Sequence, residues 1–203
     1  MITVVIPTIR GRERDYARCV TAYESRSHHD VRLITIRDLP TCGDAWNAGA
    51  AQASPGDYLH FTADDLEPHD GWDLAAAEAV DRGALPAPRI VNAAGELDSC
   101  GVYGAEMPDW APARMSVIPF MSWAQWEQIG PSLPIHYFSD NYLSWRAECA
   151  GYPTVVRRGF AFTHHWAQHG RNAGMSYDRR MAVDRAAFEH AKSTVASPPV
   201  RSM

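Results

Sequence analysis

Residues 2–65 alternate between strand-like and helix-like segments, and this alternation restricts the possible folds more than any other feature of the chain. Two segments, 13–27 and 41–54, have apolar residues at helical spacing or are rich in small residues, and they predict helices. Three runs rich in β-branched and aromatic residues predict the flanking strands: ITVVIPT (2–8), VRLITIRD (31–38) and YLHFTADD (58–65). Strands that alternate with helices form parallel sheets with right-handed crossovers, so we expect an α/β fold.

The remaining segments extend this pattern without an internal repeat or a low-complexity tract. In chain order we expect a helix at about 71–82, a strand–turn–strand hairpin at 84–101, a Pro- and Met-rich loop over the cleft at 104–121, a short helix at 122–130, a helix at 138–151, two short strands within 152–166 and an amphipathic helix at 175–192. A length of 203 residues suits a single domain, which we place at 1–196 with a flexible tail at 197–203.

Composition argues against several classes of protein. The net charge of −5 disfavours a nucleic-acid binder with a basic surface, and 46% hydrophobic residues suit a soluble domain with a sizeable core. The N-terminus lacks the basic segment of a signal peptide, and no apolar run approaches the roughly 18 residues of a membrane-spanning helix. The cysteines lack CxxC spacing and favour reduced thiols over a zinc site: Cys19, Cys42, Cys100 and Cys149. We therefore expect a cytoplasmic protein.

Two adjacent carboxylates, Asp64 and Asp65, close the third predicted strand. Like charges in contact repel, and burial of an unpaired carboxylate is costly, so such a pair either lies in a solvated turn or meets a cation. Ligands of parallel α/β sheets bind at the carboxyl ends of the strands, where Thr8 and Asp38 are also expected. Carboxylates in that position suit Mg²⁺ or Mn²⁺, hard cations that share oxygen ligands with phosphates.

Four motifs in a fixed order carry a resemblance to a known family. They are VVIPT in the first strand, an acid that closes the second strand, NAGAAQASPGDYLHFTADDLEP and SDNYLSWRAECAGY. Together they resemble the GT-A nucleotide-sugar glycosyltransferases, particularly the large inverting family, and PRIVNAAGELDSCG is similar to a hairpin that many bacterial members carry. The resemblance spans about residues 2–166. It implies a Rossmann-like, mostly parallel sheet flanked by helices, with a nucleotide-sugar-binding half at 1–103 and an acceptor and catalytic half at 104–196.

The resemblance assigns donor-binding roles to residues that match the motifs of the family. Thr8 and Asp38 fall where such enzymes contact the nucleoside, and Asn47 matches the asparagine on the nucleotide side. Asp64 matches the acid that commonly meets the ribose, and Asp65 matches the acid that ligates the metal, Mn²⁺ or Mg²⁺. Taken from the residues themselves, Asp38 is also explained as a loop acid and Asn47 as a polar helix residue.

Asp140 is the residue expected to act as general base. It opens the helix predicted at 138–151, where an acid is also a common N-cap. In the inverting enzymes that the chain resembles, an acid at this place in the motif order removes the proton of the acceptor hydroxyl as its oxygen attacks the anomeric carbon. The segment SDN lacks the second acid of the more frequent ED pair, so Asp140 would act without it.

Two adjacent histidines, His164 and His165, end the last predicted strand region. Adjacent strand residues point to opposite faces, so we expect one of them to reach the cleft. Some GT-A enzymes place a histidine here as a further metal ligand, and the resemblance favours His164; the alternative is one core and one surface histidine. His169 and Arg171 follow in a Gly-containing loop, either as a clamp on the diphosphate or as solvated residues.

Tryptophans near these motifs are interpreted first as core residues: Trp123, Trp126, Trp145 and Trp166. Trp123 and Trp126 precede the expected base region, and the alternative is that one of them forms the floor of the acceptor site. Stacking of a sugar on an indole ring is the chemistry that this alternative would use.

Three functions are consistent with the sequence. The first is a metal-dependent inverting glycosyltransferase that moves a sugar from a nucleotide diphosphate-sugar to an acceptor hydroxyl. The second is a nucleotidyltransferase on the same sheet, although TIRGRERD offers only one Gly and three Arg as a phosphate-binding signature. The third is a homologue that binds a nucleotide sugar without chemistry, because Ala63 stands where many members have a third acid or Asn. The acceptor stays open between a protein, a glycan, a lipid-linked sugar and a modified nucleic acid.

Overall fold

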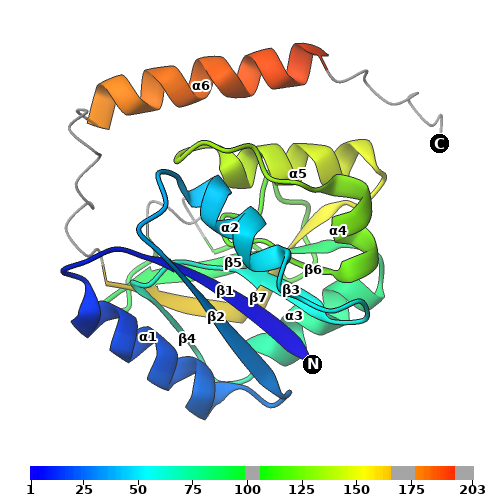
Figure 1. The fold of residues 1–203 in the computed structure, drawn as a ribbon. Helices are drawn as coiled ribbons and strands as arrows, with labels where there is room; N and C mark the ends of the chain where they lie inside the picture. The colour runs from blue at the N-terminus through cyan, green and yellow to red at the C-terminus, as the bar shows by residue number, and fades with distance from the viewer. Residues whose placement is uncertain (99–105, 166–176, 195–203) are drawn as a thin grey trace.

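The computed structural model describes residues 1–98, 106–165 and 177–194. It is an α/β fold in which helices cover a central sheet, and a smaller second sheet lies beside it (Figure 1). The elements, in chain order, are β1 (Ile2–Thr8), α1 (Glu13–Arg26), β2 (Val31–Arg37), α2 (Cys42–Ala50), β3 (Tyr58–Phe61), β4 (Leu66–Pro68), α3 (Trp72–Asp81), β5 (Leu85–Asn92), β6 (Phe120–Ser122), α4 (Trp123–Ile129), α5 (Ser139–Cys149), β7 (Thr154–His164) and α6 (Tyr177–Thr194). Within the described ranges, none of the helices combines the length and apolar character that crossing a bilayer requires.

The central sheet has four strands in the order β2-β1-β3-β6. β2 and β3 lie parallel to β1 on either side of it, and Ile2 pairs with Val31 on one side and with Tyr58 on the other. β6 completes the sheet antiparallel to β3. The carboxyl ends of β1, β2 and β3 therefore meet at one edge of the sheet, as the alternation of strands and helices predicts.

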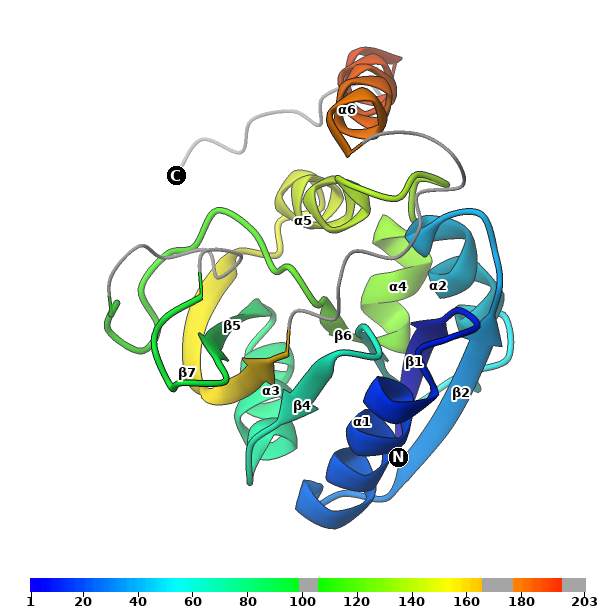
Figure 2. The same ribbon diagram turned by 90° about the vertical axis from the view of Figure 1, so that its left-hand side faces the viewer.

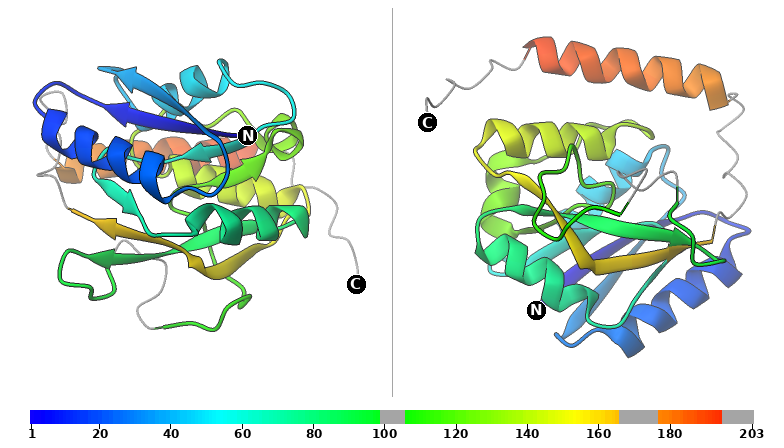
Figure 3. Two further views of the ribbon diagram at one scale, coloured as in Figure 1. Left: turned by 90° about the horizontal axis from the view of Figure 1, so that it is seen from below. Right: turned by 180° about the vertical axis from the view of Figure 1, so that it is seen from behind.

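The second sheet has the order β4-β7-β5, with the long strand β7 in the middle (Figure 3). β5 is parallel to β7, and β4 is antiparallel to it. The register places Leu66 of β4 and Asn92 of β5 on either side of His164, the last residue of β7. This pairing brings the segment that directly follows Asp65 next to the end of β7.

Side-chain alternation along β1 divides the interior into two cores, because successive strand residues face opposite sides. Ile2, Val4 and Ile6 face the side of α1 and α3, where buried aromatic rings fill the interior: Tyr23, Trp72, Phe120, Phe160 and Phe162. Val5 faces the other side and packs with residues of α2, α4 and α5. Figure 2 shows the two groups of helices on either side of the strands. Each buried Phe or Ile contributes roughly 1.5–3 kcal/mol relative to an exposed one.

Two glycines of α2, Gly43 and Gly49, lie so close to neighbouring segments that a side chain at either position would clash. A Cβ atom on Gly49 would lie 2.2 Å from Val5 Cγ1, and one on Gly43 would lie 1.9 Å from the carbonyl oxygen of Leu133. The N–H of Gly43 also donates to the carbonyl of Ile135 at 3.0 Å. α2 is therefore in direct contact with β1 on one side and with the segment that leads into α5 on the other.

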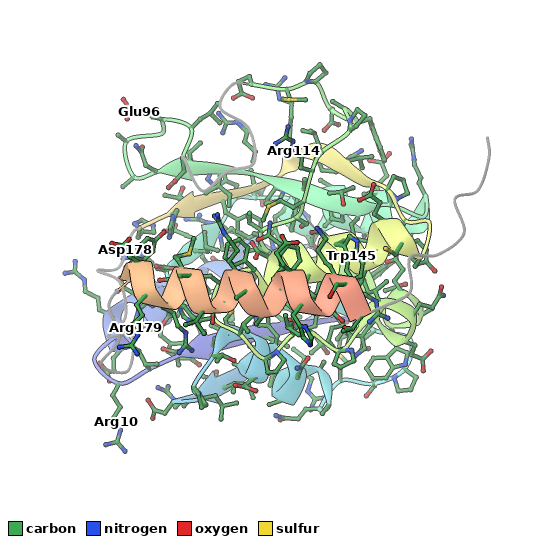
Figure 4. The ribbon with its side chains drawn as sticks, turned by 90° about the horizontal axis from the view of Figure 1, so that it is seen from above. Arg10, Glu96, Arg114, Trp145, Asp178 and Arg179 are labelled. Carbon is green, nitrogen blue, oxygen red and sulfur yellow. The ribbon has the colours of Figure 1, made fainter. Side chains whose placement is uncertain are left out.

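The C-terminal helix α6 crosses the face of the molecule beyond α5 (Figures 1 and 4). Asp184 of α6 is 3% exposed and accepts the backbone N–H groups of His136 at 3.0 Å and Tyr137 at 2.9 Å. Phe188 stacks on Phe138 with 5.7 Å between ring centroids and 10° between the planes. These contacts fasten α6 to the same segment that leads into α5.

The predicted helices and the first two predicted strands are confirmed, and the differences concern short or irregular strands. The third strand ends at Phe61 instead of continuing to residue 65, because the chain turns there. The segment predicted as two short strands is one strand, β7. The pairing register between β5 and β7 shifts between Pro88 and Arg89. The predicted loop at 104–121 ends in β6, and β4 was not predicted, because strands of three residues are too short for an alternating pattern.

The hairpin predicted at 84–101 is confirmed in part. β5 and the turn at 92–95 are present, with the N–H of Gly95 donating to the carbonyl of Asn92 at 2.9 Å. The returning strand is limited, up to residue 98, to one antiparallel bridge between Val91 and Leu97. The turn nevertheless brings the chain back along the end of β5, where the N–H of Asp98 donates to the carbonyl of Ile90 at 3.0 Å.

Candidate active site

Asp64 and Asp65 lie in a turn at the edge where the strands of the central sheet end. The turn is fastened from the side of β7, because the N–H of His165 donates to the carbonyl of Asp65 at 3.0 Å. The two side chains are not solvated, since Asp64 is 1% exposed and Asp65 is 8% exposed. The alternative of a solvated turn is therefore wrong, and each carboxylate needs a compensating partner.

Asp64 is buried against the end of β1. Thr8 Oγ1 donates to Asp64 Oδ2 at 2.6 Å, and Arg12 Nη2 lies 2.8 Å from Asp64 Oδ1. Burial raises the pKa of Asp64 to about 6, although the hydrogen bond from Thr8 and the charge of Arg12 act in the opposite direction. The predicted residues Thr8 and Asp64 are thus in direct contact, and both are engaged with other groups of the protein.

Arg12, to which the sequence motifs assign no role, bridges the two carboxylates. Its Nη2 lies 2.8 Å from Asp64 Oδ1 and 2.8 Å from Asp65 Oδ2. Arg12 occupies the N-cap position of α1, and the chain reaches it through a left-handed residue, Gly11, with φ of +87°. The signal in the sequence was the segment TIRGRERD, in which three arginines follow directly after β1.

His164 lies between two acids at the end of β7. Its Nε2 is 3.5 Å from Asp65 Oδ2, and its Nδ1 is 3.1 Å from Asp98 Oδ2. Burial disfavours the charged imidazolium, but the two carboxylates outweigh it and raise the pKa of His164. Burial likewise opposes ionisation of Asp65, but His164 and Arg12 outweigh it and lower the pKa of Asp65. Asp98, 4% exposed, was also not predicted, because in sequence it reads as an ordinary residue after a turn.

The two adjacent histidines have different surroundings. His164 lines the cavity described below, whereas His165 Nε2 lies 2.9 Å from Glu67 Oε2. Glu67 also pairs with Arg26 at 2.6 Å and lies 3.8 Å from Arg18. His165 therefore belongs to an ion-pair network beside α1, and the expectation that one histidine faces the cleft is met by His164.

The pair Asp65 and His164 fits a divalent cation. Two neighbouring ligands, each about 2.1 Å from a metal, are roughly 3.0–3.4 Å apart, and Asp65 Oδ2 and His164 Nε2 are 3.5 Å apart. The carboxylate of Asp98 on the other ring nitrogen is the outer contact that metal-binding histidines usually have. No group of three or more His, Cys, Asp and Glu side chains in residues 1–98, 106–165 and 177–194 is arranged to hold a metal. Among the described residues, Asp65 and His164 are therefore the two side chains that fit such an ion together.

A cavity of about 330 Å³ joins Asp65 and His164 to Asp140. Asp140 is the second residue of α5, and the N-cap position belongs to Phe138, which makes no side-chain cap. Burial raises the pKa of Asp140 to about 6, while the backbone N–H groups of Asn141 and of Asp140 itself act to lower it. The carboxylate is therefore not an N-cap, and its pKa is close to the value that suits a general base at neutral pH.

Apolar side chains form most of the remaining wall of this cavity. Trp46 of α2 is held in place because its Nε1 donates to the carbonyl of Thr62 at 3.3 Å. Tyr177 and Met181 of α6 also line the cavity, so α6 is part of its wall. Other residues of the wall are Leu66, Ile90, Val117, Ile118 and Phe138. A volume of this size is at the lower end of the range for small-molecule sites.

Asp38 and Asn47 lie apart from the wall of this cavity. Asp38 is exposed at the strand edge with φ of +57°, and its N–H donates to the carbonyl of Thr8 at 3.0 Å. Asn47 Nδ2 donates to the carbonyl of Ser132 at 2.9 Å, and its Oδ1 accepts the N–H of Ser132 at 2.8 Å. Asp38 is thus beside Thr8 as predicted, whereas Asn47 fastens α2 to the segment before α5. The roles of both in nucleotide binding stay predictions.

Two of the tryptophans follow the core interpretation, Trp123 and Trp126, whereas Trp145 is half-buried and packs against none of the core clusters of the described residues. Trp123 and Trp126 pack against the core on the side of α2 and α5, and neither is part of the cavity wall. Trp145 contacts the ring of Tyr142 on α5. Four residues named in the sequence analysis lie outside the described residues: Cys100, Trp166, His169 and Arg171.

No protein-family model and no curated protein sequence matches the chain. Solved structures match it at 12% sequence identity. S. aureus TarS gives a TM-score of 0.64 over 81% of this chain and 36% of TarS. GalNAc-T7 with UDP, GalNAc and Mn²⁺ gives a TM-score of 0.66 over 86% of this chain and 45% of that protein. These neighbours are GT-A glycosyltransferases. The chain has the GT-A fold.

The GT-A chain is shorter than these neighbours. The first 349 residues of TarS in complex with UDP-GlcNAc match at 12% identity with a TM-score of 0.63, over 86% of this chain and 61% of that one. The chain thus spans between about one third and three fifths of the neighbours' length. The structural likeness confirms the GT-A fold that the motifs predict. At 12% identity, the likeness is evidence for the fold alone and not for an activity.

Proposed function

We propose that the protein transfers a sugar from a nucleotide diphosphate-sugar to an acceptor hydroxyl with inversion at the anomeric carbon. The observation that carries this proposal is the shared cavity, in which the Asp65–His164 pair and the carboxylate of Asp140 face one space. The fold supports it, because TarS and GalNAc-T7, which have the same fold, have been crystallised with UDP or UDP-GlcNAc.

The donor is expected at the edge where the strands end. Asp65 and His164 would hold Mn²⁺ or Mg²⁺, and such a cation neutralises the charge that develops on a diphosphate leaving group. Asp38, exposed beside the end of β1, is the proposed contact of the nucleoside. Thr8 and Asp64 hold each other at this edge, and Asp64 is proposed to meet the ribose.

Asp140 is the proposed general base. The acceptor oxygen forms a bond to the anomeric carbon while the bond from that carbon to the diphosphate oxygen breaks. The proton of the acceptor hydroxyl passes to the carboxylate of Asp140. A pKa of about 6 leaves this carboxylate mostly ionised at neutral pH, so it can accept the proton. The apolar wall of the cavity would keep water away from the reacting carbon.

A protein that binds a nucleotide sugar without transferring it is the second candidate. It is favoured by Ala63 in place of an acid and by Arg12, which already neutralises part of the charge of the two carboxylates. Donor hydrolysis separates the two candidates, because only a transferase cleaves the bond between the sugar and the diphosphate.

The test begins with thermal shifts of the full chain with UDP, GDP, UDP-GlcNAc and other nucleotide sugars, with and without Mn²⁺. A ligand at about 100 times its dissociation constant stabilises by roughly 2.7 kcal/mol, which is easily measured. The donor that binds is then incubated with the chain and Mn²⁺, and release of nucleoside diphosphate is followed. Binding without release would favour the second candidate, and release of pyrophosphate from a nucleoside triphosphate would favour a nucleotidyltransferase.

A further inference from the structure

We propose that Arg12 is a built-in counter-cation of the donor site. It neutralises Asp64 and Asp65 when no metal is bound, and it moves to the diphosphate of the donor when a divalent cation takes its place at Asp65. The proposal rests on the proposed function, because it concerns the same metal and the same donor. It adds a residue to the site, and it predicts that metal and Arg12 compete.

The position of Arg12 is the first argument. A single nitrogen, Nη2, lies 2.8 Å from Asp64 Oδ1 and 2.8 Å from Asp65 Oδ2. The second of these oxygens is also the one that lies 3.5 Å from His164 Nε2. The guanidinium and a metal held by Asp65 and His164 would therefore need the same carboxylate oxygen, and both carry positive charge. They cannot occupy it together without repulsion.

The geometry of the contact is the second argument. Arginine usually binds carboxylates through two parallel N–H···O bonds. Within the described residues, Nε and Nη2 of Arg12 are buried but make no aligned hydrogen bond. The contact with the two acids is therefore a close approach of charges without the usual forked pairing. A divalent cation at Asp65 would replace this charge contact without breaking a forked pair.

The attachment of Arg12 to the chain is the third argument. Arg12 precedes the first turn of α1, directly after a left-handed glycine, so its side chain starts from a turn and not from the middle of a helix. Its side chain is 19% exposed, and its Nη2 lies 2.8 Å from Asp65 Oδ2, which belongs to a residue of the cavity wall. Arg12 is thus close to the cavity, and phosphate is a ligand that guanidinium groups bind well.

The first test compares Arg12→Gln with the unchanged chain. Binding of Mn²⁺ without nucleotide is measured by electron paramagnetic resonance, and binding of UDP and of GDP in saturating Mn²⁺ is measured by calorimetry. We expect Arg12→Gln to bind Mn²⁺ about tenfold more tightly, because the competing charge is gone. We expect the same variant to bind the nucleoside diphosphate roughly tenfold more weakly, because a phosphate contact is lost.

Arg18→Gln is the matched control. Arg18 lies on the same helix and pairs with Asp15 at 2.8 Å and with Glu67 at 3.8 Å, away from Asp64 and Asp65. It should change neither affinity. A residue that only holds the turn together would weaken both affinities when removed, so weaker or unchanged Mn²⁺ binding by Arg12→Gln overturns the proposal. Binding of Mn²⁺ that appears only in this variant supports it.

A second test needs no variant and therefore does not depend on folding of a mutant. A crystal structure of the unchanged chain with Mn²⁺ and the bound nucleoside diphosphate should show Arg12 away from Asp65 and on a phosphate oxygen. Arg12 still bridging Asp64 and Asp65 beside a bound Mn²⁺ overturns the proposal and leaves the proposed function intact. Absence of Mn²⁺ and nucleotide binding in both the unchanged chain and Arg12→Gln overturns both.

Discussion

His164 Nε2 lies 3.5 Å from Asp65 Oδ2, although β4, α3, β5, β6, α4, α5 and most of β7 lie between the two residues in the sequence. The contact exists because β4, directly after Asp65, pairs antiparallel with the end of β7, and Leu66 lies opposite His164. A carboxylate oxygen and an imidazole nitrogen at this separation suit a shared divalent cation.

Asp65→Asn should weaken Mn²⁺ binding and, with it, binding of the nucleoside diphosphate, each by about 10- to 100-fold, because one of the two proposed ligands of the metal loses its charge. Asp140→Asn should leave both affinities within about twofold and lower the transfer rate by a factor of about 10²–10⁴. Calorimetry and a donor-turnover assay measure the two effects. Full transfer by Asp140→Asn would remove Asp140 as the base.

Asp98→Asn should lower the affinity for Mn²⁺ by about 10- to 100-fold, although Asp98 is not expected to touch the metal. Asp98 Oδ2 lies 3.1 Å from His164 Nδ1, so its carboxylate orients the ring and holds the Nδ1 proton that leaves the Nε2 lone pair toward Asp65. Asp81→Asn is the control, because the Asp81 carboxylate accepts the hydroxyl of Tyr58 away from the site. Equal Mn²⁺ affinities of the two variants would contradict the role of Asp98.

The transfer rate should rise with pH and level off above about pH 7, with a midpoint near 6. Burial raises the pKa of Asp140 to about 6, and only the ionised carboxylate can take the proton. The neighbouring thiol of Cys42 does not titrate in this range, because burial and then Asp140 raise its pKa, so it should not contribute to the profile. A pH–rate profile at saturating donor and Mn²⁺ measures the midpoint. A rate that is flat from about pH 5 to 8 would argue against Asp140 as the base.

Asp140→Asn should also stabilise the fold by about 1 kcal/mol at about pH 8. The folded pKa of Asp140 lies above the ordinary value of 3.8, so the ionised form is disfavoured in the fold, and stability declines as the pH rises through that interval. The amide removes this cost at about pH 8 and should bring little gain at about pH 4, where the folded carboxyl is already protonated. Denaturant unfolding at both pH values measures the difference, and equal gains at both would contradict it.

Asp184→Ala should lower both stability and transfer rate. The carboxylate accepts the N–H groups of His136 and Tyr137, in the segment that leads into α5 and Asp140. Removal of a buried acceptor leaves these donors unsatisfied and costs about 2 kcal/mol. Asp178→Ala, at the exposed start of the same helix (Figure 4), is the control and should change neither quantity. Unchanged melting temperature and rate in Asp184→Ala would show that α6 does not support the cavity wall.

The pattern of apolar residues along the chain is sufficient to predict the helices and strands of the first third of the fold. β1, α1, β2, α2 and β3 each extend over enough residues to show an apolar period or a β-branched run, and their order predicts the edge where the strands end. The same order of motifs predicts the GT-A fold, and the resemblance assigns roles to Asp65, His164 and Asp140, which line one cavity. Strands of three residues, β4 and β6, carry no such period, and their existence depends on the partner strand.

The sequence by itself determined the class of fold and the residue types gathered at the strand edge, because periodicity and motif order are properties of neighbouring residues. Tertiary structure decided which groups compensate the buried carboxylates. Arg12 between Asp64 and Asp65, and Asp98 on His164, are contacts between distant segments. In the sequence, Arg12 is one of three closely spaced arginines and Asp98 is an acid after a predicted turn, so neither pattern predicts a role in the site. Only the folded path of the chain brings them to the site, since charge pairing depends on distance in space.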